Sequence, residues 1–159
     1  MVKPKILVDT SFLLPALGVE VEDEAMSVIP LFRRLEVYYL EAGLLEAMWK
    51  MLRLIPPSKY NRLKLGLEAI RETYHLLTPP AKAYIEAIEI YRKGHRDYID
   101  ALHYATAKAE RISFLTIDYR FLEFLESCGY EVEGIVVTPR GLKELSAGNP
   151  RSDYSFKKL

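Results

Sequence analysis

The sequence predicts an α/β domain built around a mostly parallel central sheet of about five strands. Short apolar runs alternate along the chain with longer segments of helical periodicity, as in proteins made of successive strand–helix units. The first run, 6–8, is continuously apolar, which is typical of a parallel strand that is buried on both faces. The chain has 159 residues, half of them hydrophobic and 28% charged, so it is long enough to bury one sizeable core.

The first half of the chain is expected to hold two strands and three helices. The run Ile6-Leu7-Val8 ends at Asp9, and a helical pattern that Asp23 could cap follows. Pro56 ends a later helical pattern that carries large apolar side chains on one face. The expected elements are strands at 6–8 and 36–39 and helices at 23–35, 40–55 and 57–71.

The second half continues the same alternation. Pro79 and Pro80 begin a helix, and Gly94 suits its C-terminal cap. The expected elements are strands at 73–77, 112–116 and 131–137 and helices at 79–93, 96–110, 119–128 and from 139. We see no linker or repeat and expect one domain over 1–147, followed by a polar tail over 148–159.

Composition excludes several classes of protein. Cys128 is the only cysteine, which excludes an internal disulfide and a cysteine-based zinc site. No apolar run approaches the roughly 18 residues that span a bilayer, and the N-terminus lacks a signal-peptide pattern, so we expect a cytosolic protein. Lys and Arg total 22, as do Asp and Glu, so net charge gives no support to nucleic-acid binding. The absence of glutamine beside abundant charged residues favours a heat-loving source.

Acidic residues follow two of the expected strands. Asp9 ends the first strand and Asp118 lies just past the fourth, and ligands of parallel sheets bind outside the carboxyl ends of the strands. Asp97 and Asp100 share a face of the Ala-rich helix. Each residue has a plainer interpretation: an Asp can cap a helix, and Glu46 can pair with Lys50 four residues on. The combination favours a shared acidic site.

Three segments of the chain resemble the PIN-domain family, which includes the VapC-type toxin ribonucleases. They are 8–14, which begins Val-Asp-Thr-Ser, 98–107, which contains Asp100-Ala101, and 114–121, which contains Thr116-Ile117-Asp118. The resemblance implies a three-layer α/β/α fold and carboxylate ligands at Asp9, Asp100 and Asp118. Glu46 best matches the family's second acidic residue, with Glu41 as the alternative, and Asp97 is a further acidic neighbour. Ser11 and Thr116 would orient the carboxylates or a water.

Such a site suits Mg²⁺ or Mn²⁺, which prefer hard oxygen ligands. The resemblance implies hydrolysis of single-stranded RNA by a metal-activated water, which leaves a 5′-phosphate and a 3′-hydroxyl. It also implies a homodimer and, for a toxin, a small antitoxin partner that binds an apolar groove, for which helix 57–71 and the tail around 154–156 are candidates. Basic and tyrosine side chains that could bind RNA are Lys59, Arg62, Lys64, Arg92, Lys93, His95, Arg96, Tyr60, Tyr98 and Tyr119.

Other functions remain open at this point. A PIN-like fold can also serve as an RNA-processing nuclease, or as a scaffold that binds RNA or protein with little activity. No glycine-rich phosphate loop or dinucleotide fingerprint occurs, so nucleotide-binding enzymes are disfavoured. The three histidines show no zinc-site spacing, and we expect them to be ordinary core or surface residues.

Overall fold

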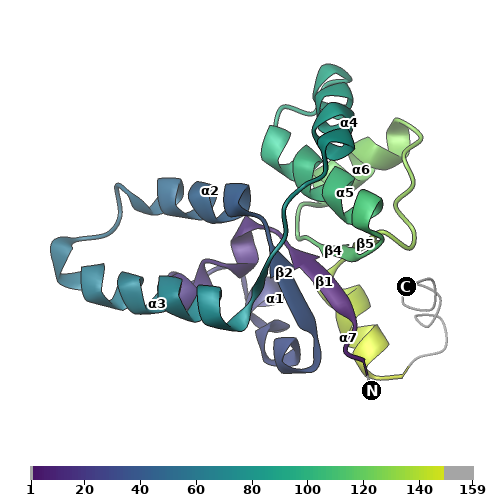
Figure 1. Ribbon diagram of the computed structural model, residues 1–159. Helices are drawn as coiled ribbons and strands as arrows, with labels where there is room; N and C mark the ends of the chain where they lie inside the picture. The colour runs from purple at the N-terminus through teal and green to yellow at the C-terminus, as the bar shows by residue number, and fades with distance from the viewer. Residues whose placement is uncertain (1, 149–159) are drawn as a thin grey trace.

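A five-stranded sheet in which every neighbouring pair is parallel forms the centre of the computed structural model, which describes residues 2–148 (Figure 1). The strand order is β3-β2-β1-β4-β5. The strands are β1 (Lys5–Val8), β2 (Glu36–Tyr39), β3 (His75–Leu76), β4 (Ser113–Leu115) and β5 (Val136–Val137). β1 is therefore the central strand, and its continuously apolar sequence is explained by helices on both faces of the sheet.

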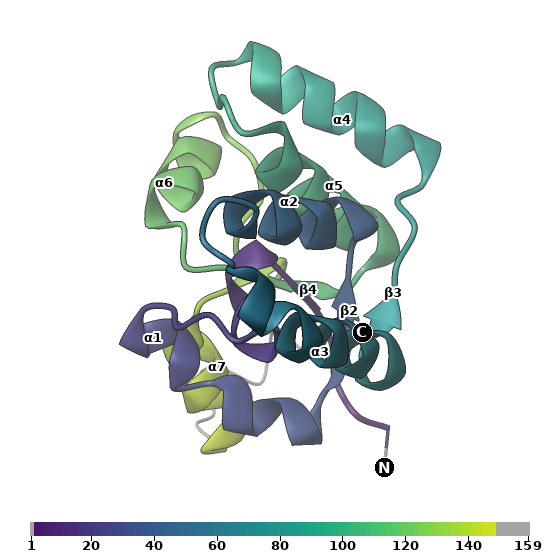
Figure 2. The same cartoon turned by 90° about the vertical axis from the view of Figure 1, so that its left-hand side faces the viewer.

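Helices cover both faces and produce the three layers that the sequence predicts (Figures 1 and 2). Ile6 and Val8 of β1 pack into one core, and Leu7 between them packs into the other, because successive strand residues point to opposite faces. The seven α-helices within residues 2–148 are α1 (Asp23–Met26), α2 (Glu41–Met51), α3 (Tyr60–Thr73), α4 (Ala81–Arg92), α5 (Tyr98–Glu110), α6 (Tyr119–Ser127) and α7 (Pro139–Ser146). The first core includes side chains of α2, α3 and α7, and the second includes those of α4, α5 and α6.

The prediction of one continuous helix over 23–35 is wrong. Only α1 is α-helical there, and a 3₁₀ segment, Ile29–Arg34, follows it. Pro30 lies near the start of that segment, and a proline cannot donate the backbone hydrogen bond that a continuous α-helix needs. Asp23 lies inside the first turn of α1, and Glu22 takes the N-cap position without a side-chain bond.

Two expected strands are much shorter in the structure. β3 keeps only His75 and Leu76 of the range 73–77, and β5 keeps only Val136 and Val137 of the range 131–137. Both are edge strands, so each pairs on one side only. The tail predicted for 148–159 lies outside the described residues except for Gly148. Within the described part of the chain, no helix is both long enough and apolar enough to cross a membrane.

Candidate active site

Asp9 lies directly after β1, at the carboxyl edge of the sheet, and is 6% exposed. Its Oδ2 accepts a hydrogen bond of 2.7 Å from the hydroxyl of Thr116, and its Oδ1 accepts one of 2.9 Å from the backbone N–H of Ser11. The register of β1 against β4 sets Val8 beside Leu115, so the residues that follow these strands, Asp9 and Thr116, meet across the ladder. The sheet itself therefore fixes the Asp9 carboxylate.

Thr116 also joins Asp9 to Asp118. Its hydroxyl oxygen accepts a hydrogen bond of 3.1 Å from the backbone N–H of Asp118 while its proton goes to Asp9. Asp118 caps α6, accepting a bond of 3.0 Å from the N–H of Phe121. One fully buried hydroxyl thus connects the two acidic positions that the sequence places at the ends of β1 and β4.

Asp100 lies in the first turn of α5, which the side chain of Asp97 caps by accepting bonds from the N–H groups of Ile99 and Asp100. Burial raises the pKa of Asp100 to about 9, with further contributions from Asp97, from a hydrogen bond to Asp118 and from the charges of Asp118 and Asp9. Burial also raises the pKa of Asp9 to about 6, against the lowering effect of its hydrogen bonds. Asp9, Asp100 and Asp118 therefore act on one another.

Glu46 approaches the site from α2, and its side chain is 19% exposed. Its Oε1 lies 3.0 Å from Nζ of Lys50, whose charged form is also favoured by the carboxylates of Asp9 and Asp97. Glu41, the alternative, is engaged elsewhere: Arg71 binds both of its carboxylate oxygens, at 2.6 and 2.8 Å. The geometry therefore favours Glu46 as the fourth acidic residue of the cluster.

Ser11 and Asp97 both form hydrogen bonds that stabilise the local fold around the acids. Ser11 bonds Asp9 through its backbone N–H, and no hydrogen bond of its hydroxyl to a carboxylate occurs within residues 2–148. The capping interpretation of Asp97 is confirmed, while its charge still acts on Asp100.

The sequence did not single out His95 as a neighbour of the acids. Its Nε2 lies 3.5 Å from Oδ2 of Asp100, and its ring stacks on Phe121 with the ring centres 4.3 Å apart. Burial lowers the pKa of His95. No spacing signal could have revealed this contact, because His95 lies in the loop between α4 and α5. His103 is an ordinary core residue, as expected, with Nδ1 2.8 Å from the carbonyl oxygen of Ile99.

The donor set suits a hard divalent cation, since Asp9, Asp100 and Asp118 offer carboxylate oxygens that repel one another and that a cation would stabilise. The side chains as placed do not close around an ion: no three His, Cys, Asp or Glu side chains of residues 2–148 converge closely enough to hold one. The residues therefore fit a Mg²⁺ or Mn²⁺ site by the chemistry of their oxygen donors.

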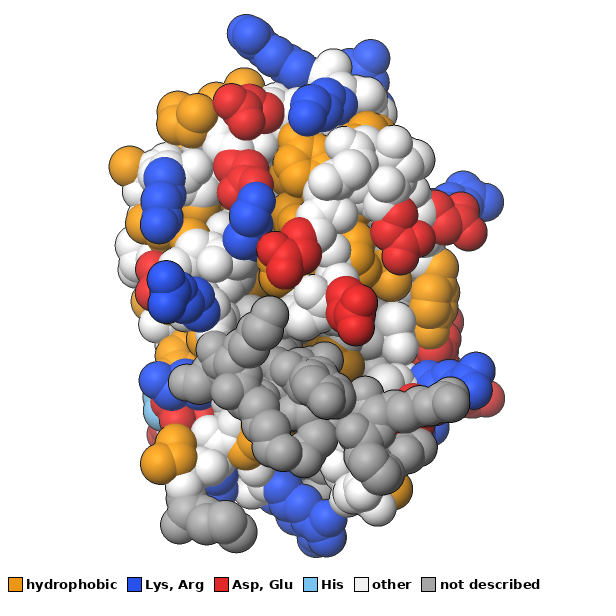
Figure 3. All heavy atoms as spheres, turned by 90° about the vertical axis from the view of Figure 1, so that its right-hand side faces the viewer, with side chains coloured by type: hydrophobic (Ala, Val, Ile, Leu, Met, Phe, Trp, Pro, Cys, Tyr) orange, Lys and Arg blue, Asp and Glu red, His pale blue; other side chains and the backbone are white. Residues whose placement is uncertain are grey.

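Two of the tyrosines considered for RNA binding form hydrogen bonds within the protein. Tyr98 donates its hydroxyl to the carbonyl oxygen of Tyr84, and Tyr119 bonds Glu24. The face shown in Figure 3 carries acidic and basic side chains interspersed and no broad basic patch, in keeping with the zero net charge.

A family comparison decides the classification. The model of the PIN domain matches residues 6–125, a range that contains all five acidic residues of the cluster. The chain belongs to the PIN-domain family. No curated protein is similar enough in sequence to match this PIN domain.

Solved structures share the fold at low sequence identity. A toxin-antitoxin complex from Klebsiella pneumoniae has a TM-score of 0.60 and 18% identity, covering 84% of this chain and 97% of that one. PAE2754 from Pyrobaculum aerophilum has a TM-score of 0.59 and 19% identity, covering 91% and 96%. VapC20 from Mycobacterium tuberculosis, described as a toxin that cleaves the sarcin-ricin loop, has a TM-score of 0.55 and 19% identity, covering 79% and 96%.

Proposed function

We propose that this PIN domain is an endoribonuclease that cleaves single-stranded RNA and depends on Mg²⁺ or Mn²⁺. The observation that carries the proposal is the link from Asp9 through Thr116 to Asp118 at the carboxyl edge of the sheet, with Asp100 against it. Buried carboxylates that repel one another are costly for the fold alone, and such costs are typical of functional sites.

Each residue of the cluster has a distinct task in this proposal. Asp9, Asp100 and Asp118 would hold the cation, with Glu46 as the fourth acidic ligand from α2. The bound ion supplies the positive charge that activates a water and stabilises the phosphate during in-line displacement. Thr116 keeps the Asp9 carboxylate in place, and Asp97 fixes the first turn of α5, which carries Asp100. Ser11 supports Asp9 through its backbone N–H.

The test is cleavage of an end-labelled, mixed-sequence, single-stranded RNA with added Mn²⁺ or Mg²⁺. Wild type, Asp9→Asn and wild type with EDTA are compared, and a folded Asp9→Asn protein is verified by circular dichroism. We expect cleavage that requires both the metal and Asp9, with products ending in a 5′-phosphate and a 3′-hydroxyl. Equal cleavage by wild type and folded Asp9→Asn would overturn the assignment of this site.

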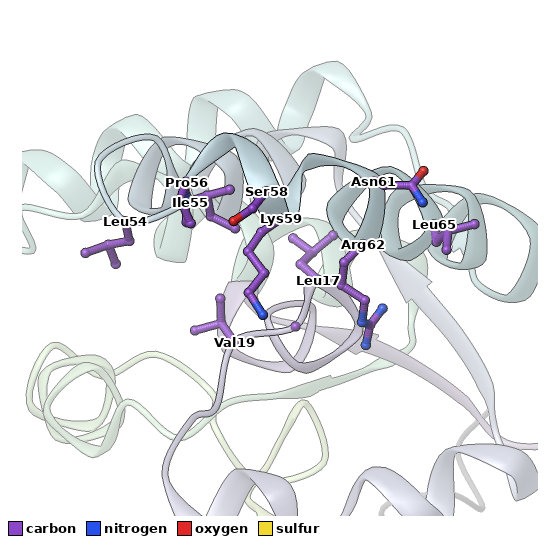
Figure 4. A pocket seen from close by; sticks show the side chains of 11 residues that line it. Leu17, Val19, Leu54, Ile55, Pro56, Ser58, Lys59, Asn61, Arg62 and Leu65 are labelled. Atoms are coloured by element: carbon purple, nitrogen blue, oxygen red, sulfur yellow. The ribbon is translucent and has the colours of Figure 1, made fainter.

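We further propose that the chain is the toxin of a toxin–antitoxin pair. Figure 4 shows a hollow of about 870 Å³ between the segment after β1, the loop that follows α2 and the start of α3. Its apolar lining includes Leu17, Leu54 and Leu65, and its basic side chains are Lys59 and Arg62. No acidic or aromatic residue lines it, which fits an acidic, amphipathic protein segment better than a stacked base. The Klebsiella pneumoniae neighbour is itself part of a toxin-antitoxin complex.

The product of a small reading frame next to this gene tests the pairing. We expect it to co-purify with the PIN domain and to inhibit cleavage, and we expect Arg62→Glu to weaken the complex. Lys143→Glu on α7 is the matched control, because it makes the same type of charge reversal away from the hollow. Complexes of equal strength for the two variants would place the partner elsewhere.

A scaffold that binds RNA or protein with little activity is the second candidate. It is favoured by the lack of three metal-ligating side chains close enough to hold an ion within residues 2–148. RNA binding without cleavage, by a folded and metal-loaded protein, would favour this function over the nuclease.

We also propose that the chain forms a homodimer. Apolar side chains are exposed on α2 at Leu45 and Trp49, at Leu52 directly after it, and on α4 at Tyr84 and Ile85. Trp49 is 73% exposed and Ile85 is 59% exposed, and exposed apolar groups of this kind commonly mark interaction surfaces. In Figure 2, α4 crosses the top of the molecule and α2 lies below it, near mid-height.

A further inference from the structure

Lys50 brings a positive charge into the acidic cluster. Its Nζ lies 3.0 Å from Oε1 of Glu46, and the carboxylates of Asp9 and Asp97 also favour its charged form. No other lysine or arginine of residues 2–148 forms an ion pair with Asp9, Glu46, Asp97, Asp100 or Asp118. Lys50 therefore differs from the basic residues elsewhere on the surface.

The ammonium group of Lys50 is accessible to a ligand from solvent. Its side chain is 54% exposed, whereas its partner Glu46 is 19% exposed, so the ammonium group lies on the solvent side of the pair. A lysine ammonium has three donors on a flexible stem, and one bond to Glu46 leaves two of them for a second acceptor. The ion pair alone does not explain the arrangement, because exposed pairs with this spacing add little to stability.

The positive charge of Lys50 would reduce the repulsion between RNA phosphates and the acidic cluster. Each phosphate carries a negative charge, and it must approach a cluster of five carboxylates in a protein of zero net charge. A lysine beside the ligands offsets that repulsion locally, and it does so without a broad basic surface.

We propose that Lys50 is a phosphate-binding residue of this site, whose ammonium group contacts a non-bridging oxygen of an RNA phosphate at the acidic cluster. This inference rests on the proposed ribonuclease function. The group that recognises the substrate here is a point charge without base specificity, so Lys50 contributes to affinity for RNA of any sequence.

The experiment measures the salt dependence of RNA binding. Fluorescence anisotropy of a short labelled single-stranded RNA is recorded with Mg²⁺ in an Asp100→Asn background, which prevents cleavage during the titration. Lys50→Gln, Lys50→Arg and Lys108→Gln are compared in this background, with thermal melts to verify folding. Lys108 is the matched control: it also forms an ion pair with a glutamate, Glu86, and it lies near the far end of α5 from Asp100.

We expect Lys50→Gln to reduce the slope of log affinity against log salt by about 0.7, the value for one lost contact to a single-stranded phosphate. Lys50→Arg should keep the slope, and Lys108→Gln should leave it unchanged. Binding with the same slope for Lys50→Gln and Lys108→Gln would overturn the role of Lys50 and leave the proposed ribonuclease intact. No RNA binding by the Asp100→Asn parent at any salt concentration would instead contradict the proposed function itself, and this inference with it.

Discussion

Thr116 is the single residue on which the arrangement of the acids depends most. Its hydroxyl donates to Asp9, accepts from the N–H of Asp118 and is completely buried. A buried carboxylate that loses its donor cannot turn to water for a replacement, so the cost falls on the folded protein.

Thr116→Val should therefore lower both stability and activity. We expect a loss of about 1–3 kcal/mol in the free energy of unfolding, because the Asp9 carboxylate would be left without its side-chain donor. Urea denaturation measures this loss, and the RNA assay should show greatly reduced cleavage. Thr116→Ser keeps the hydroxyl and is the control. Equal stability of the valine and serine variants would show that the hydrogen bond contributes nothing.

The acids should also make the metal-free protein sensitive to pH. The pKa of Asp100 rises from an ordinary 3.8 to about 9 in the folded chain, first through burial, and that of Asp9 rises to about 6. A raised carboxyl pKa means that the folded state prefers the neutral form. The associated stability is thus complete below about pH 4 and is lost progressively as the pH rises toward 9.

In EDTA, we expect the Tm of wild type to fall between pH 6 and pH 9, and the Tm of Asp100→Asn to fall less. We expect the pH-dependent losses in the free energy of unfolding to differ by at least about 1 kcal/mol between the two proteins, which corresponds to a difference of about 3 °C in Tm for a chain of this size. Differential scanning calorimetry over this range provides the measurement. Parallel pH profiles for the two proteins would mean that Asp100 ionises normally in the folded chain.

At the scale of the element, α2 presents two glutamates with different tasks. Glu41, at its first position, is bound by Arg71 of α3. Glu46 pairs with Lys50, whose charged form is also favoured by Asp9 and Asp97. The two glutamate side chains are five residues apart, a spacing that makes their directions around the helix axis differ by about 140°.

This difference leads to a paired prediction. Glu46→Gln should reduce kcat for RNA cleavage at least tenfold, because an acidic ligand is lost. Glu41→Gln should leave kcat within about twofold and cost at most about 1 kcal/mol of stability, since its ion pair is exposed. Steady-state kinetics at saturating Mn²⁺ distinguishes the two. The reverse order of effects would assign Glu41 as the fourth ligand.

The sequence predicted those elements whose local pattern agrees with their final packing. Asp9 and Asp118 were found because parallel strands bring their carboxyl ends to one edge. The helix over 23–35 failed because the apolar spacing continued through Pro30, where the backbone cannot remain α-helical. The last strand was predicted too long, since Val132 packs against the core from a turn ahead of β5, where its carbonyl oxygen accepts bonds from the N–H groups of Ile135 and Val136.

Other parts of the site could not be predicted from spacing at all. Lys50 fits an ordinary ion pair with Glu46 four residues away, and that pair does form, so only the three-dimensional structure reveals its proximity to Asp9 and Asp97. His95 reaches Asp100 from a loop because its ring stacks on Phe121 of α6, and tertiary contacts of this kind leave no periodic trace in a sequence.

At the scale of the whole molecule, the exposed apolar side chains of α2 and α4 form the surface that we propose as the dimer interface. We expect Trp49→Asp with Ile85→Asp to convert a dimer into a monomer, since a charge in an apolar interface is costly. Light scattering after size-exclusion chromatography measures the mass. Lys143→Asp on α7 is the control, because it introduces the same acidic side chain on a helix other than α2 and α4. A monomeric wild type at every concentration would refute the dimer.

The hydrogen bond between Asp9 and Thr116 joins residues that are 107 positions apart in the chain. During synthesis, the ribosome therefore releases the first carboxylate long before its buried donor, and β1 cannot acquire β4 as a neighbour until then. A nascent chain that stops short of Asp97 lacks three of the five acidic residues of the cluster, Asp97, Asp100 and Asp118. On the proposed function, the chain therefore gains its activity only after most of its own message has been translated, because Asp118 is the last of the acids to be made.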